Sequence, residues 1–278
     1  LERMIYVFVP DQETALQRFL AGESDLYGLR GEDYATLVTR QEELGFRMYN
    51  VGPSSSSQFF VFNQNPVEGP EDGGITPPEL DWLSNRIFRR AMAHLVDRST
   101  IITSINYGFG YPQYSFVPRF SPYYWDGADD AALRYDPGRA AELLESIDFI
   151  DLDGDGWRED PEGNRISLSL ATNSGGSVRE RICELFVQEA AALGVELRFE
   201  ALDFNVLVRK LVATYDWEII LIGLTGSVDP ISGQNVYPSA GNLHMIEPNQ
   251  TNPRRDWEAE VDTLWVEANN TTDVDRRA

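Results

Sequence analysis

The densest group of side chains that could hold a metal ion is an acidic segment, residues 151–162, which reads DLDGDGWREDPE. Asp151, Asp153 and Asp155 stand at alternate positions, a glycine follows, and Glu162 occupies the twelfth place. This spacing matches a calcium-binding loop, in which carboxylate oxygens surround the ion and glycine permits a sharp turn. One interpretation of this segment is therefore a calcium site, with these four acidic residues as its ligands.

An acidic hairpin loop without an ion explains the same residues. Pro161 stands beside Glu162, and the segment that follows has the pattern of a strand, whereas a helix follows a calcium loop of this type. Both interpretations stay open at the level of the sequence.

The sequence contains no specific catalytic motif. The sequence has 45 acidic residues, so a carboxylate pair for acid–base catalysis has too many candidates to name one. Only two histidines and Cys183 are present, and Cys183 lies on or beside the apolar side of a predicted helix, where a thiol is inert. We therefore assign no catalytic residue and no enzymatic activity.

The balance of charge excludes two classes of partner. The formal net charge is −22, and Lys210 is the only lysine. A field of that sign repels phosphate backbones and anionic lipid headgroups, so nucleic acid and membrane surfaces are poor partners. Cationic and neutral ligands remain, and 278 residues suffice for one large or two modest domains.

The second half of the chain has the clearest order. It contains three segments typical of strands, which are Ile166–Ala171, Val195–Ala201 and Trp217–Gly223. Ser177 and Glu180 form a capping-box pattern before one intervening helix, and Asp203 precedes the other. A β-α-β-α-β order predicts a parallel sheet covered by helices, with ligands bound at the carboxyl ends of its strands. The candidate ligand site is therefore the carboxyl end of the last of these strands, at residues 223–229.

The first half is less regular. We expect a strand at Ile5–Val9, a helix capped by Asp11, a short strand at Asp25–Leu29 and a stronger helix capped by Ser84. The segment Tyr107–Trp125 is long, irregular and rich in aromatic residues. These rings either line an apolar ligand cleft or fasten a long loop to the core.

Taken in order along the chain, several segments resemble one known family. They are Val7–Asp11 with Leu20–Asp25, Phe60-Val61-Phe62-Asn63 with Pro66, Leu83–Ala91 with Asp97-Arg98, Asp153–Gly156, Leu193-Gly194-Val195 and Asp229-Pro230. The family is that of the bacterial ABC-transporter extracellular solute-binding proteins, family 5, which includes dipeptide, oligopeptide and nickel binders. Each segment alone is weak, and the specificity lies in their order.

The resemblance implies an α/β fold of the periplasmic-binding-protein-like type II, with a mixed sheet and helices on both of its faces. The chain then corresponds to an internal fragment of a two-lobed protein. Residues 1–57 are the tail of the first lobe, and residues 58–278 are most of the second, ligand-binding lobe. In the family the acidic loop recurs as a surface hairpin, which favours the ion-free interpretation.

The same resemblance locates a ligand site after the last predicted strand. It assigns contacts between backbone and ligand to four residues, Gly223, Leu224, Thr225 and Gly226. Ser227 stands where peptide binders of the family carry an aspartate for the ligand's ammonium group. Asp229 either replaces that aspartate or caps the turn before Pro230.

The implied function is capture of a solute, peptide-like in most of the family, between two hinged lobes. The closed form is presented to a membrane permease of an ABC importer, and no bond is made or broken. The expected protein is a bacterial monomer in the periplasm or lipid-anchored at the cell surface, with no nucleic-acid partner. The alternatives are a carboxylate-dependent hydrolase and an extracellular interaction module stabilised by calcium at residues 151–162.

Overall fold

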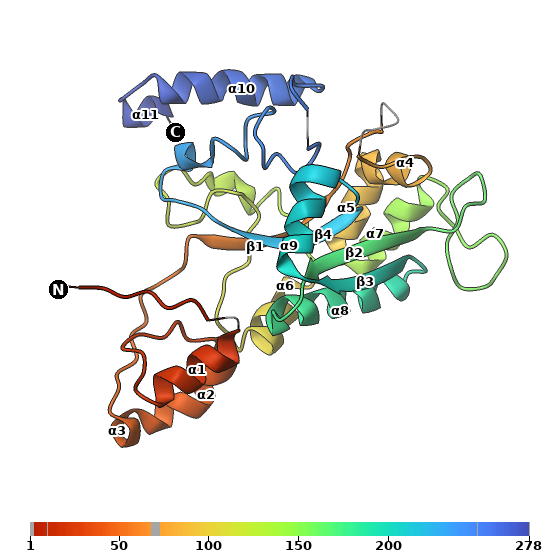
Figure 1. Cartoon of the computed structure of the whole chain (residues 1–278). Helices are drawn as coiled ribbons and strands as arrows, with labels where there is room; N and C mark the ends of the chain where they lie inside the picture. Colours follow the sequence, from red (N-terminus) through yellow and green to blue (C-terminus); the bar gives the residue numbers. More distant parts are fainter. Residues whose placement is uncertain (1–2, 10, 68–72, 249, 278) are drawn as a thin grey trace.

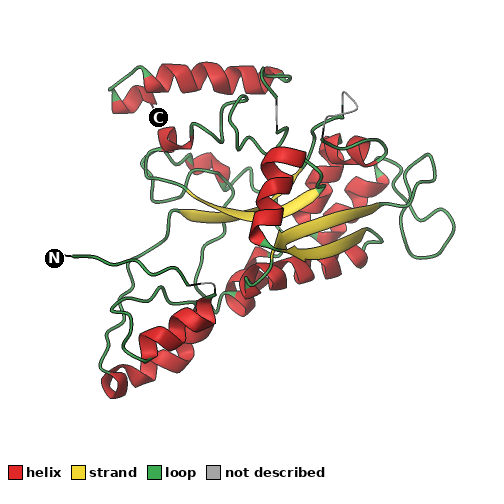
Figure 2. Cartoon of the chain, viewed as in Figure 1, coloured by secondary structure: helices red, strands yellow, loops and turns green. Residues whose placement is uncertain are grey.

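The computed structural model describes residues 3–9, 11–67, 73–248 and 250–277. Within these ranges one four-stranded sheet forms the centre, and helices cover it (Figures 1 and 2). The strands are β1 (Ser56–Phe62), β2 (Ser167–Asn173), β3 (Glu196–Leu202) and β4 (Ile219–Thr225). Residues 3–50 form a smaller helical part beside the sheet, shown in red and orange in Figure 1.

The strand order is β1-β4-β2-β3, and the sheet is mixed. Strand β2 pairs in parallel with both β3 and β4, whereas β1 pairs antiparallel with β4. The three predicted strands of the second half therefore lie in one sheet, as the β-α-β-α-β pattern predicted. The chain leaves β2 toward β3 and then crosses back to β4, so the direction of winding reverses between β2 and β4. Crevices at such a reversal are the usual ligand sites of open α/β sheets.

The helices of the described ranges vary in length. They are α1 (Gln12–Leu20), α2 (Gly31–Leu37), α3 (Gln41–Leu44), α4 (Glu79–Ser84), α5 (Arg86–His94), α6 (Arg98–Thr100), α7 (Pro137–Glu145), α8 (Ser177–Ala191), α9 (Phe204–Arg209), α10 (Asp256–Asn269) and α11 (Val274–Arg277). Short 3₁₀ or π turns add Val38–Arg40, Ile101–Ile105, Asp126–Ala128, Lys210–Thr214 and Pro230–Gly233. None of the described helices is long and apolar enough to cross a membrane.

Side chains cap several of these helices where the sequence predicts caps. Asp11 and Asp203 accept hydrogen bonds from the first turns of α1 and α9. Two expectations are wrong by one residue. Asn85 rather than Ser84 caps α5, because Ser84 ends α4, and Gly176 precedes α8, so Ser177 is already helical and no capping box forms.

The larger core lies on one face of the sheet, where α8 packs against β2, β3 and β4 and the packed pair α5 and α7 completes the same apolar cluster. Its fully buried members include Phe88, Leu144, Leu168, Ile219 and Leu221. Helix α5 repeats its apolar residues at the spacing of one helical face, and that face is the buried one. Removing these side chains from water supplies most of the stability of the domain.

A smaller core covers the opposite face. Leu207 and Leu211 pack there on Trp217, Ile220 and Met245. Figure 1 shows α9 in front of the sheet and α5 and α7 behind it. The predicted mixed sheet with helices on both faces is confirmed.

The strands predicted at Ile5–Val9 and Asp25–Leu29 are wrong, since the described residues of both segments form extended coil. Phe8 is 98% exposed, and Leu26 is 83% exposed. A strand needs a neighbour for its backbone N–H and C=O groups, and neither segment has one within the described residues. The lobe boundary predicted at residues 57–58 falls inside β1 and stays a prediction.

Candidate ligand-binding site

A pocket of about 160 Å³ opens at the end of β4. Its walls come from four segments that are distant in the sequence, which are residues 55–59 of β1 and its approach, residues 116–118, residues 224–227 and residues 230–243. The carboxyl end of a parallel strand therefore lies at its centre, as the sheet topology predicts.

The pairing of β4 explains why this end projects from the sheet. On one side, β1 pairs with β4 as far as Ser56 opposite Thr225, and the backbone N–H of Gly226 donates to the carbonyl of Ser55 at 3.0 Å. On the other side, β2 pairs with β4 only at Ile219 and Ile220. The last residues of β4 thus extend beyond β2 into the crevice.

Four of the six predicted ligand-binding residues line this pocket, which are Leu224, Thr225, Gly226 and Ser227. Gly223 does not line it and faces α8 instead. A Cβ atom at that position would lie 2.9 Å from the guanidinium of Arg179 and 3.3 Å from the carbonyl oxygen of Ser57. Glycine here permits close packing. Contact of any of these residues with a ligand stays a prediction.

Asp229, the sixth predicted residue, is also absent from the lining. Its carboxylate accepts a hydrogen bond from the backbone N–H of Ile231 at 3.0 Å and caps the short 3₁₀ helix Pro230–Gly233. This geometry matches the turn-capping role that the sequence offered as one of two interpretations.

One wall of the pocket is aromatic. The rings of Phe59 and Phe116 meet edge to face with centroids 5.9 Å apart, and Phe116 meets Tyr237 in the same way at 6.0 Å. Trp265 of α10 supports Tyr237 from behind, with centroids at 5.3 Å. Burial raises the pKa of Tyr237 above its ordinary value of 10.0, so its phenol is uncharged at neutral pH with or without this shift.

The aromatic segment Tyr107–Trp125 serves in both of the ways that its sequence suggested. Phe116 lines the pocket together with two neighbours, and it is 58% exposed. Tyr114 instead packs beneath the guanidinium groups of Arg98 and Arg134, at 4.9 and 5.5 Å from its ring centroid. That ring fastens the segment to the body of the domain.

The sequence did not predict the wall at residues 230–243, because this segment has neither helical nor strand periodicity. Its position depends on α10. The backbone N–H and hydroxyl of Ser239 both donate to the carboxylate of Asp262, at 2.7 and 2.6 Å. The backbone N–H of Leu243 donates to the carbonyl of Asn235 at 2.8 Å.

A buried ionic cluster fixes the start of α10. Glu258 is 1% exposed and Glu247 is 2% exposed. The guanidinium of Arg255 contacts both carboxylates at 2.8 Å, and the backbone N–H groups of Arg254 and Arg255 donate to Glu258 at 2.9 and 3.0 Å. Burial by itself raises the pKa of Glu258, but these donors and the charge of Arg255 outweigh it, so the pKa lies below its ordinary value.

We expect the variant Glu258→Gln to lose about 1–3 kcal/mol of stability at pH 7, because it removes the charge that these donors face. The folded-state pKa is below the ordinary value of 4.5. The stabilisation is therefore present above that pH and is lost as the pH falls through the lowered pKa.

Urea unfolding between pH 3 and pH 7 measures the difference in free energy of unfolding between variant and wild type. We expect this gap to shrink in acid. Glu260→Gln, on the exposed side of α10, serves as the control. A gap that stays constant with pH contradicts the assignment.

The acidic segment forms a different cluster from the predicted one. Carboxylate oxygens of Asp151, Asp153 and Glu159 lie within 4.8 Å of one another. Among the described residues, Asp155 and Glu162 lie outside this group. Glu159, which the calcium pattern did not include, joins it because its backbone bridges Ile150 and thereby fixes its side chain inside the loop. Calcium binding stays a prediction.

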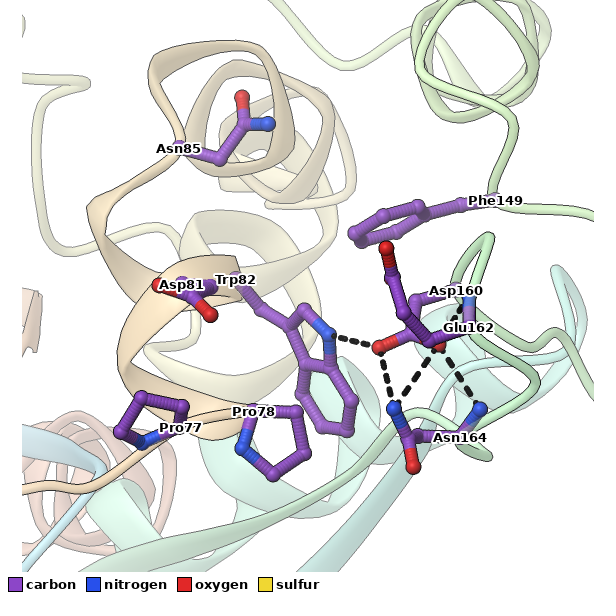
Figure 3. A pocket seen from close by; sticks show the side chains of 9 residues that line it. All are labelled: Pro77, Pro78, Asp81, Trp82, Asn85, Phe149, Asp160, Glu162 and Asn164. Carbon is purple, nitrogen blue, oxygen red and sulfur yellow. Dashed lines mark hydrogen bonds between the residues drawn. The ribbon is translucent and has the colours of Figure 1, made fainter.

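Glu162 lies instead at a second cavity of about 480 Å³, whose lining includes none of Asp151, Asp153 and Glu159 (Figure 3). Figure 3 shows Trp82 and Phe149 on its walls and Asp160 beneath. The indole N–H of Trp82 donates to the carboxylate of Asp160 at 3.0 Å, and Asn164 donates to both oxygens of that carboxylate. Asp160 is thus satisfied within the protein, and it stabilises the following turn by accepting from the backbone N–H groups of Glu162 and Asn164 at 3.1 and 2.8 Å.

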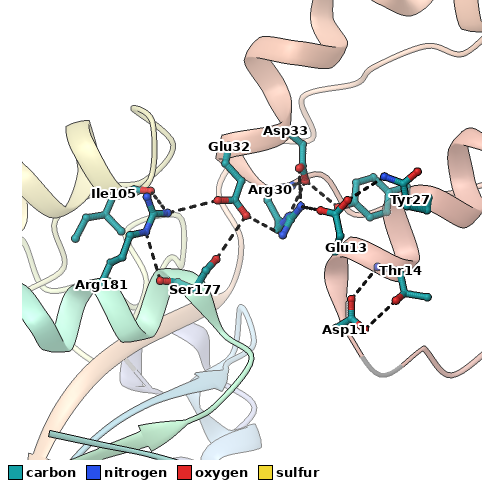
Figure 4. Close-up of polar contacts among 11 residues, drawn as sticks. Asp11, Glu13, Thr14, Tyr27, Arg30, Glu32, Asp33, Ile105, Ser177 and Arg181 are labelled. Atoms are coloured by element: carbon teal, nitrogen blue, oxygen red, sulfur yellow. Dashed lines mark hydrogen bonds and ion pairs between the residues drawn. The ribbon is translucent and has the colours of Figure 1, made fainter.

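A polar bridge links the helical N-terminal part to the first turn of α8 (Figure 4). Arg30 holds Asp33 through two hydrogen bonds of 2.8 and 2.7 Å and also contacts Glu32 at 2.7 Å. Glu32 in turn lies 3.7 Å from the guanidinium of Arg181 and accepts from the hydroxyl of Ser177 at 3.5 Å. These contacts tie the start of α2 to the first turn of α8, which follows the carboxyl end of β2.

Comparison with known proteins agrees with the family resemblance of the sequence. The family described as "Bacterial extracellular solute-binding proteins, family 5 Middle" matches residues 1–242. A "Probable ABC transporter-binding protein" of Deinococcus radiodurans is 31% identical over 264 residues, which cover 89% of this chain and 42% of that protein. The oligopeptide-binding protein AppA of Bacillus subtilis is 22% identical over 242 residues, covering 83% and 39%. The chain thus spans about two fifths of the length of these relatives.

Two solved structures show the fold. That of AppA from Bacillus subtilis in complex with a nonapeptide superposes with a TM-score of 0.77 and 20% identity, over 97% of this chain and 49% of AppA. The periplasmic binding protein MelB of Agrobacterium fabrum in complex with stachyose gives 0.78 and 17%, over 97% and 42%. With the family match over most of the sequence, this chain belongs to the bacterial extracellular solute-binding proteins, family 5.

Proposed function

We propose that this chain supplies most of one lobe of the solute-binding component of an ABC importer. The lobe contributes one wall of a cleft in which a solute is captured, and closure of the two lobes presents the solute to a membrane permease. The expected location is the bacterial periplasm or the cell surface.

The observation that carries this proposal is the position of residues 224–227. They follow a parallel strand, they line a pocket, and they belong to a chain of the solute-binding family. Opening and closing of lobes around a ligand is a hinge motion, which needs no reactive group at the site. The lining offers hydroxyl, amide, aromatic and backbone groups, which bind a ligand through hydrogen bonds and ring contacts.

Relatives of the same fold hold different solutes. AppA was solved with a nonapeptide and MelB with stachyose, so the fold admits both peptides and saccharides. A peptide-like solute is the family expectation for this chain. The proposed function requires only that the solute binds reversibly and leaves unaltered.

Native mass spectrometry of the full-length gene product, purified without added solute, tests this proposal. We expect a small molecule to co-purify, to return unaltered after denaturation, and to raise the melting temperature when it is added back to stripped protein. At a hundredfold excess over the dissociation constant, a ligand that binds only the native state stabilises it by about 2.7 kcal/mol.

Two results contradict the proposal. Conversion of the recovered molecule into a product by the stripped protein indicates a hydrolase. A rise in melting temperature with calcium alone, and with no organic solute, indicates a calcium-stabilised module instead. The variant Asp151→Asn identifies the second case. It removes one carboxylate of the acidic cluster and does not change the pocket, so it lowers the effect of calcium on the melting temperature.

A further inference from the structure

The pocket at the end of β4 has no charged lining. None of its described lining residues is an Asp, Glu, Lys or Arg, although 24% of the chain is charged. Tyr237 also lines the pocket, but a phenol with its ordinary pKa of 10.0 is already uncharged at neutral pH, and burial raises that pKa further. A charged group bound here would lose its hydration and find no opposite charge in this wall, which is costly.

Asp229, the charged residue nearest in sequence to the lining segment 224–227, does not supply a charge to this pocket wall. The family pattern places its ammonium-binding aspartate at Ser227, which carries no charge, and Asp229, two residues later, is the residue that could replace that aspartate. Its carboxylate already caps the turn at Ile231, and it does not line the pocket. This wall therefore has no carboxylate with which to bind the amino terminus of a peptide.

Polar groups without partners do line the pocket. The side chains of Ser55, Ser57, Ser227 and Asn235 make no hydrogen bond to other described residues. Ser55 and Ser57 are also half-buried. An apolar ligand group that displaced their water would leave these groups unsatisfied, at about 1–3 kcal/mol for each buried one. A ligand that carries hydroxyl groups satisfies them.

The shape of the pocket adds a third constraint. Its volume is about 160 Å³, and a cavity of about 150 Å³ admits a single six-membered ring such as benzene. Phe116 is more than half exposed and stands beside Phe59, so an apolar ring face is open to a ligand. The pocket thus offers space for one ring, an aromatic wall and a set of free hydroxyl and amide groups.

We infer that this pocket binds an uncharged, hydroxylated six-membered ring, namely one sugar unit of a neutral saccharide. The inference rests on the proposed function and specifies its solute class. The ring packs against Phe59 and Phe116 through its C–H face, and its hydroxyls exchange hydrogen bonds with Ser57, Ser227 and Asn235. A zwitterionic peptide is disfavoured at this wall.

Isothermal titration of the full-length protein, stripped of solute, tests the inference with maltotriose, mannotriose and raffinose. Trialanine serves as a zwitterionic peptide and acetyl-trialanine amide as an uncharged one. We expect at least one trisaccharide to bind, with a dissociation constant raised roughly tenfold by Phe116→Ala and about fivefold by Ser57→Ala. The controls Phe120→Ala and Ser84→Ala, outside the pocket, leave the affinity unchanged.

Three results overturn the inference. They are failure of all three saccharides to bind, weakening of trialanine binding by the two pocket variants, and weakening of acetyl-trialanine amide binding by them. In the last two cases solute capture at this pocket stands and only the solute class is wrong. Failure of solute capture itself is recognised separately, by the absence of any co-purifying molecule. Melting curves of each variant show that its fold is intact.

Discussion

The variant Phe88→Ala is expected to lower the free energy of unfolding by about 3–5 kcal/mol. Phe88 is fully buried in the larger core, with its ring centroid 5.9 Å from that of Phe149. Its removal loses the transfer free energy of the ring and leaves a cavity between α5 and the 145–150 turn, which close packing around it cannot fill.

Urea unfolding followed by circular dichroism measures this loss as a lower midpoint with an unchanged slope. Phe204→Ala is the matched control, since Phe204 begins α9 and is 55% exposed. Its change is expected to stay within about 0.5 kcal/mol. A loss at Phe88 no larger than that of the control contradicts the position of α5 against the sheet.

The variant Asn63→Asp is expected to cost about 3–5 kcal/mol at pH 7, because it places an unpaired charge in the interior. Asn63 is fully buried directly after β1. Its amide nitrogen donates to the carbonyls of Tyr215 and Trp217 at 3.0 and 2.7 Å, and its oxygen accepts from the backbone N–H of Asn65 at 3.0 Å. An aspartate puts a negative oxygen against two carbonyl oxygens.

The pH dependence of this variant has a definite sign. Burial and the two carbonyls raise the folded-state pKa of the new carboxyl above its ordinary value of about 3.9. The loss relative to wild type therefore grows as the pH rises through that pKa, and it is smaller at pH 4 than at pH 7. Urea midpoints of variant and wild type at both pH values measure it, with Asn205→Asp at the exposed start of α9 as control. Equal losses at the two pH values contradict this account.

The sequence predicted the second half of the domain well because its signals are local. Ile166–Ala171 alternates apolar and polar residues, and the observed β2 begins one residue later and ends two residues later. A strand, a helix and a parallel strand can be connected in few ways, so the order of elements also predicted the shared sheet. Helix α8 needed only its apolar stripe, since Ile182, Cys183 and Phe186 face the core.

Long-range pairing was harder to predict. The segment Ile5–Val9 has the composition of a strand as strong as that of β1, yet only β1 has a partner among the described residues. The same apolar and β-branched residues are therefore a strand in one place and an exposed coil in the other. Composition shows a tendency to form a strand, whereas the partner decides whether one forms.

The candidate site likewise contains residues that local sequence signals predict and residues that only long-range contacts place. Residues 224–227 could be named from the strand before them and from the family pattern. Phe116 and Tyr237 could not, because loops without periodicity carry them and contacts as remote as Trp265 place Tyr237. In the acidic segment, spacing named Asp151 and Asp153, but Glu159 entered the cluster through the backbone bridges of the hairpin, which no residue pattern records.

The antiparallel pairing of β1 has a consequence for biogenesis. Translation makes Phe59–Phe62 before α4 to α9, whereas their neighbours in β4, from Ile219 to Ile222, emerge only after those helices have been made. Strand β1 is therefore the last of the four strands to find its partner. Its apolar residues, Phe59–Phe62, stay unpaired while the chain up to β4 is synthesised. Such a segment is open to aggregation until β4 has been made.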